Sequence, residues 1–252
     1  MEFQQQEQEQ HQRLDIVPTI ATAVDMMRAS RYSETMDLLR SGLGHLLSLA
    51  ERTSPTSSSL LSSCSSDTLV SLESVSLRLC EEEEDHEDEP SKQYFFGASA
   101  FGALAIYDKA LRFAGETTDA IFWEGDNVHR ASSVLLYNTA LVHHLLGLQG
   151  PNQQRHLKKA LKLYEMAIDV LHNCKKHSAV DKMITLAIFN NKGHVYCQFS
   201  ELTQVQVCID WLKSILDCCA GDFPNRDDEL LHFRLTVLLW DAEHCPPAAP
   251  AA

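Results

Sequence analysis

The sequence is short of positive charge. Its 252 residues include 21 Lys and Arg against 35 Asp and Glu, which gives a formal net charge of −14 at pH 7. Residues 81–89 concentrate eight of the acidic side chains in one run. Sequence-independent nucleic-acid binding needs a basic stripe that releases phosphate counterions. The charge balance therefore argues against nucleic acid as a partner.

Catalytic and metal-binding motifs are also lacking. The sequence has no Gly-rich phosphate loop, no His-Glu-x-x-His, no Gly-x-Ser-x-Gly and no Cys-x-x-Cys pair among its eight cysteines. The tightest group of metal-ligand types is His172, Cys174 and His177. Structural zinc takes four ligands, and a polar helix end explains the group equally well. We expect no enzyme activity, no cofactor and no metal; an enzyme or metalloprotein with an unrecognised His/Cys site is the alternative.

A signal peptide and a membrane span are not indicated either. The chain opens with Met1-Glu2-Phe3 and a Gln/Glu-rich stretch, which lacks the charged and apolar regions of a secretion signal. The longest stretch without Asp, Glu, Lys or Arg, 131–154, contains Asn138, His143 and His144, which hydrocarbon would leave without partners. We expect an intracellular soluble protein, cytoplasmic or nuclear, without a membrane partner and with reduced cysteines.

Composition divides the chain into five parts. We predict a disordered tail at 1–13, a helical hairpin at 14–50, a disordered Ser-rich and acidic loop at 51–93, a helical repeat region at 94–241 and a Pro/Ala tail at 242–252. The acidic run repels itself and stays solvated, or else attracts a basic partner. Phosphate on the serines of 57–76 would extend the loop further.

The hairpin at 14–50 rests on two helical patterns. Apolar residues recur at spacings of three and four from Ile16 to Met27 and again from Met36 to Leu47, with Ser33 as the expected N-cap of the second helix. The short connection makes the two helices antiparallel neighbours.

A small β-hairpin is a further expectation. Residues 68–79 alternate serine with leucine or valine, which is the period of a strand. Residues 94–101 are the candidate partner strand, and a plain loop is the alternative.

From residue 101 onward the apolar pattern is helical. The expected helices lie near 101–114, 129–148, 154–173, 178–199, 203–219 and 226–241. Gly115, the Gly150-Pro151 pair and the stretch Gly221 to Pro224 separate some of them. Connections this short predict antiparallel stacking.

An internal repeat runs through these segments. Small or apolar residues flank a ring or a bulky side chain in Ala103-x-x-x-Tyr107-x-x-Ala110, Ala160-x-x-x-Tyr164-x-x-Ala167 and Val205-x-x-x-Ile209-x-x-Leu212. The preceding helices carry Asn138-Thr139-Ala140-x-x-His143 and Asn191-Lys192-Gly193-x-x-Tyr196. Such spacing puts each set on one helical face, where small residues let a neighbouring helix approach closely. All of these positions are predicted to pack between repeats.

Residues 133–216 resemble two tandem tetratricopeptide repeats. Ala160-Leu161-x-Leu163-Tyr164-x-x-Ala167-Ile168 is similar to the second helix of that family, and the stretch Asn191 to Tyr196 to the first. The sequence departs from the family in an insertion at 149–155, in the loss of both consensus alanines from the second unit, and in the missing proline at each repeat end. The matching part is roughly a third of the chain.

The resemblance implies an all-α solenoid of antiparallel hairpins whose first helices line a concave groove that binds a peptide or helix. The groove residues would be Tyr137, Asn138, Leu141, His144, Asn190, Asn191, His194 and Gln198. Asparagine suits such a groove because its amide donates to and accepts from a peptide backbone. Tyr137, Leu141, Ala187 and Asn190 stand where the family's carboxylate clamps for chaperone tails have cations, which argues against that partner. We therefore expect a scaffold or adaptor with a protein or peptide partner.

Overall fold

The computed structural model describes residues 16–52, 72–77, 104–114, 126–149, 152–175, 178–219 and 227–244. These residues are mostly helical, with seven helices and one two-stranded antiparallel sheet. The helices are α2 (Ile16–Arg28), α3 (Tyr32–Arg52), α4 (Asp126–Gln149), α5 (Gln153–Leu171), α6 (Ala179–Gln198), α7 (Leu202–Asp217) and α8 (Asp227–His244). The strands are β1 (Leu72–Ser76) and β2 (Lys109–Phe113). The predicted tail at 1–13, the acidic run and residues 94–101 lie outside the described residues.

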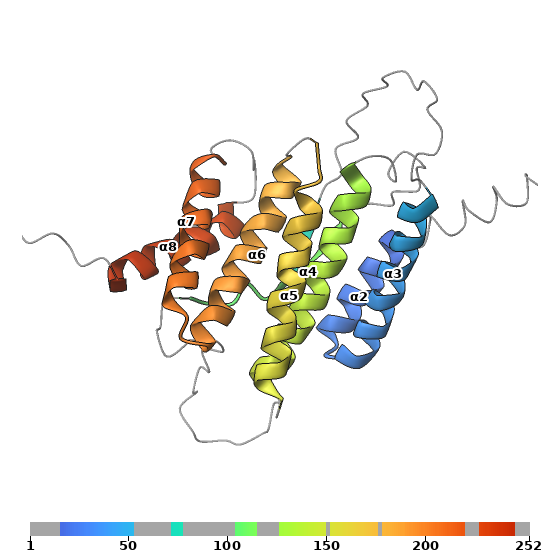
Figure 1. Ribbon diagram of the computed structural model, residues 1–252, viewed down its shortest axis with the longest axis horizontal. Coiled ribbons are helices and arrows are strands. Elements are labelled where there is room, and N and C mark those ends of the chain that lie inside the picture. Colours follow the sequence, from blue (N-terminus) through green and yellow to red (C-terminus); the bar gives the residue numbers. More distant parts are fainter. Residues whose placement is uncertain are drawn as a thin grey trace, which may run out of the picture.

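The helices form hairpins that stack in chain order. The pairs α2–α3, α4–α5 and α6–α7 pack together, and α3, α5 and α7 each also contact the first helix of the following pair. The helices α2, α4, α6 and α8 contact one another in that order, so the stack runs from α2 at one end to α8 at the other (Figure 1). We call α2, α4, α6 and α8 the inner helices, because they carry the sheet and the segment before it. The helices α3, α5 and α7 are the outer helices.

Local sequence accounts for the two kinds of helix. The outer helix α5 buries one stripe, which includes Ala160, Tyr164 and Ala167, and exposes the charged residues between them. The inner helices α4 and α6 are apolar on most sides, since neighbours cover them on both flanks and the sheet segment covers the inner side. A capping box of Ser178 and Asp181 starts α6.

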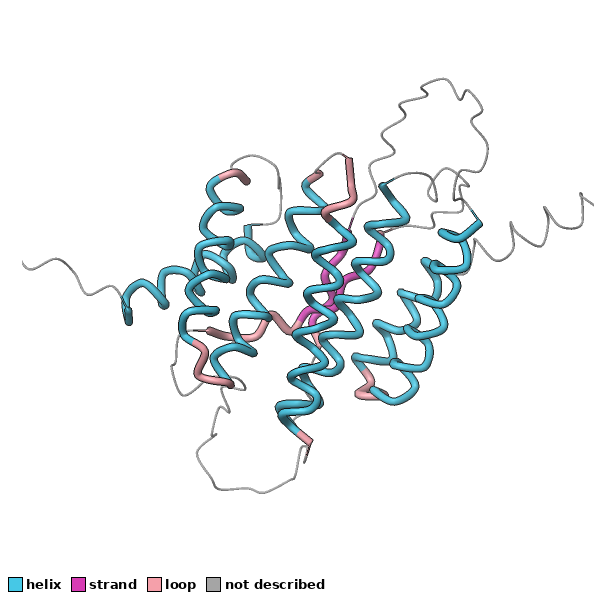
Figure 2. The backbone as a smooth tube through the Cα atoms, in the orientation of Figure 1, coloured by secondary structure: helices cyan, strands magenta, loops and turns pink. Residues whose placement is uncertain are grey.

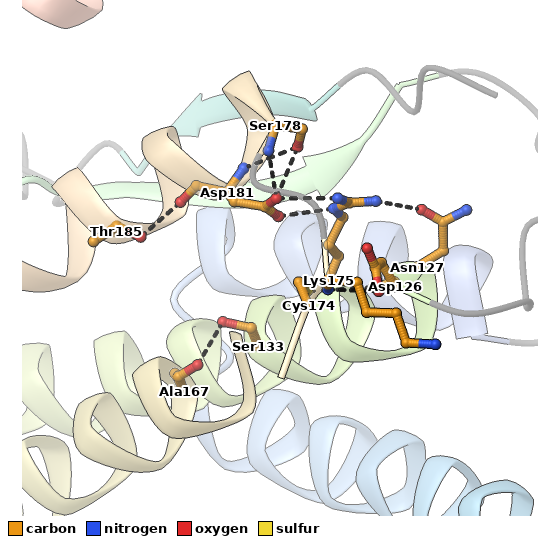
Figure 3. A network of polar contacts seen from close by, with 10 residues as sticks. Asp126, Asn127, Ser133, Ala167, Cys174, Lys175, Ser178, Asp181 and Thr185 are labelled. Carbon is orange, nitrogen blue, oxygen red and sulfur yellow. Dashed lines mark hydrogen bonds and ion pairs between the residues drawn. The ribbon is translucent and has the colours of Figure 1, made fainter. Parts of the chain in front are cut away.

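The start of α6 is also tied to the start of α4. The Asp181 carboxylate accepts hydrogen bonds from two residues. Arg130 Nε donates to Oδ1 at 2.7 Å, and a terminal nitrogen of the same guanidinium donates to Oδ2 at 3.0 Å. The backbone N–H of Ser178 donates to Oδ2 at 2.7 Å. Arg130 also donates to Asn127 at 3.0 Å. Figure 3 shows Ser178, Asp181 and Asn127 within this polar network. The Asp181 side chain is only 3% exposed, so the bidentate pair is a buried cross-link between α4 and α6.

Helices α4 and α5 approach closely at Gly147. A Cβ atom added there would lie 2.7 Å from Leu157 Cδ2 and 3.2 Å from the Leu157 backbone nitrogen. Gly147→Ala is therefore expected to lower the free energy of unfolding by about 1–3 kcal/mol, because α5 has to shift outward to admit the methyl group. Urea denaturation followed by circular dichroism measures the change.

Gly44 in α3 provides a matched control, since a Cβ atom there meets nothing within 4 Å. Gly44→Ala is expected to stabilise the protein by about 0.5–1 kcal/mol through higher helix propensity. If Gly147→Ala stabilises the protein as Gly44→Ala does, the close approach at Gly147 is wrong.

The structure corrects the prediction of a helix at 101–114. Residues 104–108 are neither helix nor strand, and residues 109–113 form β2. Tyr107 and Ala110 therefore do not lie on a helical face; Ala103 lies outside the described residues. A small sheet is present, in which β1 pairs with β2; the predicted partner strand, residues 94–101, lies outside the described residues. The register runs from Leu72 opposite Phe113 to Ser76 opposite Lys109. The helical spacing of 101–114 does not determine the structure, because hydrogen bonds to distant partners stabilise the non-helical backbone.

Smaller differences concern element ends. Ser33 is not the N-cap of α3, since that helix already includes Tyr32. Among the described residues of the predicted repeat region at 94–241, the first helix begins at Asp126, and α8 continues past 241 to His244. Among the described residues, no helix has the length and hydropathy to cross a membrane.

Candidate functional site: the inner face of the helix stack

An extended segment lies across the inner helices. Residues 104–113, here called the inner segment, start against α6, where Leu104 lies near Gly193, and end beside α2, where Arg112 contacts Asp25 at 3.9 Å. Helices α2 and α4 both pack against β2. The segment therefore crosses the helices in the direction opposite to their chain order. Figure 2 shows the strand pair passing along one side of the stack.

Two asparagines hold the backbone of this segment. Asn191 on α6 accepts from the Tyr107 N–H at 2.8 Å and donates to the Tyr107 carbonyl at 3.0 Å. Asn138 on α4 makes the same pair of bonds with Leu111, at 3.0 and 2.8 Å. Each side-chain amide thus satisfies both backbone groups of one residue, as a neighbouring strand would. The two contacts are four residues apart on the inner segment and one helical hairpin apart on the stack.

Further polar groups of the helices bind backbone carbonyls on the same edge of the inner segment. Asn190 donates to the Ala105 carbonyl at 3.0 Å, and the Tyr137 hydroxyl donates to the Lys109 carbonyl at 3.0 Å. The Thr236 hydroxyl of α8 donates to Asn190 at 3.2 Å and fixes its amide. Residues 105, 107, 109 and 111 therefore point their backbone groups toward the helices.

The opposite edge of the inner segment pairs with β1. Backbone groups of successive residues in a strand point to alternate edges, so residues 108, 110 and 112 face β1. The Leu77 N–H donates to the Asp108 carbonyl at 3.2 Å, and Val75 and Glu73 lie opposite Ala110 and Arg112. Residues 108–113 of the inner segment are therefore bound on both edges, which satisfies the backbone of this buried stretch.

Side chains of the inner segment fill the space between helices. The Tyr107 ring packs on Phe233 and His232 of α8, with centroids 4.8 and 5.3 Å apart. Leu104, Ala110 and Leu111 have no exposed area. The inner segment is thus part of the hydrophobic core and is also hydrogen-bonded to the inner helices.

A layer of buried rings lies under the asparagines. The Asn191 amide is 3.3 Å from the Tyr164 hydroxyl, which is 3.3 Å from His144 Nδ1, and His144 Nε2 is 2.9 Å from His194 Nδ1. Burial lowers the pKa of His144 well below its usual value and raises the pKa of Tyr164 well above its usual value. Both groups are neutral at physiological pH, so they position Asn191 through hydrogen bonds and are poor proton-transfer groups.

An asparagine amide that bonds both backbone groups of one residue thus recurs on α4 and on α6 in the described part of the inner face. No family model, curated protein or solved structure matches this chain. The function of the inner face is therefore inferred from the contacts within the chain itself.

The predicted groove residues lie on the inner face, but they are not exposed. Seven of them have no exposed area, namely Tyr137, Asn138, Leu141, His144, Asn190, Asn191 and His194. Gln198 is half-buried. The expectation of an open groove is wrong for these residues because the inner segment and the neighbouring helices cover them.

The predicted packing positions on the helices are mostly buried. Ala140, His143, Ala160, Tyr164, Ala167, Gly193, Val205, Ile209 and Leu212 are buried, and Tyr196 is half-buried. His143 turns to the outer helix α5, where its Nδ1 lies 2.9 Å from Nδ1 of His156. Burial, together with nearby cations, lowers the pKa of His143 to about 4.

The structure describes only part of the alternative site of His172, Cys174 and His177. His177 lies outside the described residues, and Cys174 directs its Sγ to the Asp126 carbonyl at 3.7 Å. Burial raises the pKa of Cys174 to about 11 and that of Cys208 to about 12, so both are neutral thiols. No group of three His, Cys, Asp or Glu side chains among the described residues could hold a metal ion.

The occupant of the inner face was missed at the sequence level. Leu104, Tyr107 and Leu111 recur at spacings of three and four, which is the helical pattern. The signals for a different structure were Gly102 and Gly115, which limit the segment to about a dozen residues, and the β-favouring Ile106, Tyr107 and Phe113.

Proposed function

We propose that this chain is a tetratricopeptide-like helical scaffold that binds protein partners as extended segments along its inner helices. The inner segment, residues 104–113, occupies that binding surface in cis. The pairs of hydrogen bonds from Asn138 and Asn191 to the backbone of Leu111 and Tyr107 carry the proposal. They recognise main-chain groups, so they do not require the sequence of the inner segment.

The solenoid part of the proposal is supported by the order of contacts. Each hairpin packs against its neighbours in the stack, and inner helices meet inner helices. This is the contact pattern of a repeat architecture. Recognition of an extended chain through its backbone, with side chains in pockets, is a widespread mode of peptide binding.

Because the inner segment already occupies the surface, a partner must bind tightly enough to displace it. Intramolecular segments act at effective concentrations on the order of 1 mM. A partner segment present at about 1 μM would need roughly 1,000-fold tighter binding than the inner segment to replace it. The proposed scaffold therefore selects strong or locally concentrated partners.

Binding of a peptide in trans tests the proposal. The probe is a fluorescently labelled synthetic peptide with the sequence of residues 104–113, and the protein is the full chain with Leu111→Pro, which removes the N–H that donates to Asn138. We expect this variant to bind the probe with a micromolar Kd and the wild-type chain to bind it at least 10-fold more weakly. Fluorescence anisotropy measures both.

Two controls separate backbone recognition from hydrophobic adhesion. A peptide with N-methyl groups at the positions of Tyr107 and Leu111 keeps all side chains but lacks the two N–H donors, and we expect it to bind at least 10-fold more weakly. Tyr107→Gly, which removes the ring packed on Phe233, is a second way to release the inner segment. Equal binding of both peptides, or no binding by either folded variant, would contradict the proposal.

A further inference from the structure

Two positions of the inner segment carry side chains that are almost completely enclosed. Tyr107 is 1% exposed, and its ring packs on Phe233 and His232 of α8. Ala110 has no exposed area and lies opposite Val75 of β1. Loss of the ring would leave a cavity, and a side chain larger than methyl at the second position would have to displace its neighbours. Both positions therefore restrict which residue a bound segment can carry.

A third position of the inner segment meets two acidic side chains. Arg112 Nε donates to the carboxylate of Glu73 on β1 at 3.0 Å, and a terminal nitrogen of the same guanidinium lies 3.9 Å from Asp25 on α2. The side chains of Glu73 and Asp25 are 47% and 64% exposed, so water screens both pairs and each contributes little affinity. Two carboxylates at one position still discriminate between a basic and an acidic residue.

We propose that the inner face selects extended partner segments by three side chains: an aromatic residue, a small residue three positions later and a basic residue two positions after that. These are the places of Tyr107, Ala110 and Arg112. The inference rests on the proposed function, because it takes the inner segment as the example of a bound partner. The amides of Asn138 and Asn191 bind main-chain groups, which every extended segment offers. Selection among segments therefore depends on the side chains.

Substituted peptides test the two enclosed positions. The reference probe is the labelled peptide of residues 104–113, and the protein is the full chain with Leu111→Pro. The peptide with Tyr107→Ala is expected to bind at least 20-fold more weakly, because the space between the ring and Phe233 is left empty. The peptide with Ala110→Leu is expected to bind at least 10-fold more weakly, although it is more apolar. Non-specific hydrophobic adhesion predicts tighter binding for Ala110→Leu, so the sign of this change separates the two explanations.

The basic position is tested by coupling between peptide and protein. The peptide with Arg112→Gln is expected to bind the Leu111→Pro chain about 5-fold more weakly than the reference peptide. When the chain also carries Glu73→Gln and Asp25→Asn, the two peptides should bind within about twofold of each other. The peptide with Lys109→Gln is the matched control. It loses the same charge, but Lys109 makes no ion pair with a described residue, so its Kd relative to the reference should be the same in both chains.

All peptides are also measured on the full chain with Tyr107→Gly, which releases the inner segment in a different way. If the reference peptide binds neither folded chain, the proposed function fails and this inference fails with it. If the reference peptide binds but Tyr107→Ala and Ala110→Leu change its Kd by less than about 3-fold, backbone recognition stands and the side-chain preference is wrong. An equal loss for Arg112→Gln with and without the two acidic residues would refute the basic position.

Discussion

Asn191→Ala is expected to lower the free energy of unfolding by about 2–6 kcal/mol. The truncation removes the two hydrogen bonds that the Asn191 amide makes with the N–H and the carbonyl of Tyr107, and Tyr107 is only 1% exposed. Each buried backbone group that loses its hydrogen bond costs about 1–3 kcal/mol. The free energy of unfolding of a domain is about 5–15 kcal/mol in total. This one side chain is therefore expected to contribute a large part of it.

Urea denaturation of the full chain measures the loss, and Asn152→Ala provides the control. Asn152 precedes α5, is exposed and makes no capping hydrogen bond with its side chain, so its removal should change stability by less than about 0.5 kcal/mol. A loss below 1 kcal/mol for Asn191→Ala would mean that water reaches Tyr107 and that the inner segment is held by side-chain packing alone.

The helical hairpins were predictable because their signals are local. The stripe of Ala160, Tyr164 and Ala167 in α5 repeats at helical spacing, and the Gly150-Pro151 pair separates α4 from α5. The capping residues Ser178 and Asp181 are three positions apart at the start of α6. Each of these signals lies within one or two turns of the element that it specifies.

The inner segment was not predictable because its partners are distant in sequence. Tyr107 binds Asn191, which is 84 residues away, and Leu111 binds Asn138, which is 27 residues away. The pairing of β2 with β1 closes a loop that contains the acidic run. A local pattern carries no information about such partners, and the helical spacing of 101–114 was therefore misleading.

The asparagines illustrate what residue chemistry adds. Repeat spacing placed Asn138 and Asn191 at equivalent positions of two helices, and the chemistry of the amide indicated contact with a peptide backbone. The structure places both against the backbone of an extended segment. Sequence reasoning had no means of recognising that this segment belongs to the same chain, because a groove residue and a core residue show the same periodicity.

The second large effect is expected at the cross-link between the starts of α4 and α6. Asp181→Ala should lower the free energy of unfolding by about 3–5 kcal/mol, since it removes the carboxylate that forms a bidentate ion pair with the guanidinium of Arg130, which is 14% exposed. The substitution also removes the acceptor for the Ser178 N–H and thus half of the capping box of α6. Both losses act on the contact between neighbouring hairpins.

Asp37→Ala is the matched control for Asp181→Ala. Asp37 pairs with Arg40 at 2.7 Å, but both side chains are more than 70% exposed, so this pair is expected to contribute less than about 1 kcal/mol. The double variant Arg130→Met with Asp181→Ala separates the two causes. Removal of both charges should recover part of the stability lost in Asp181→Ala, because no unpaired buried charge remains. If the double variant is less stable than Asp181→Ala, the stability of α6 depends on Arg130 through its packing and not through the ion pair.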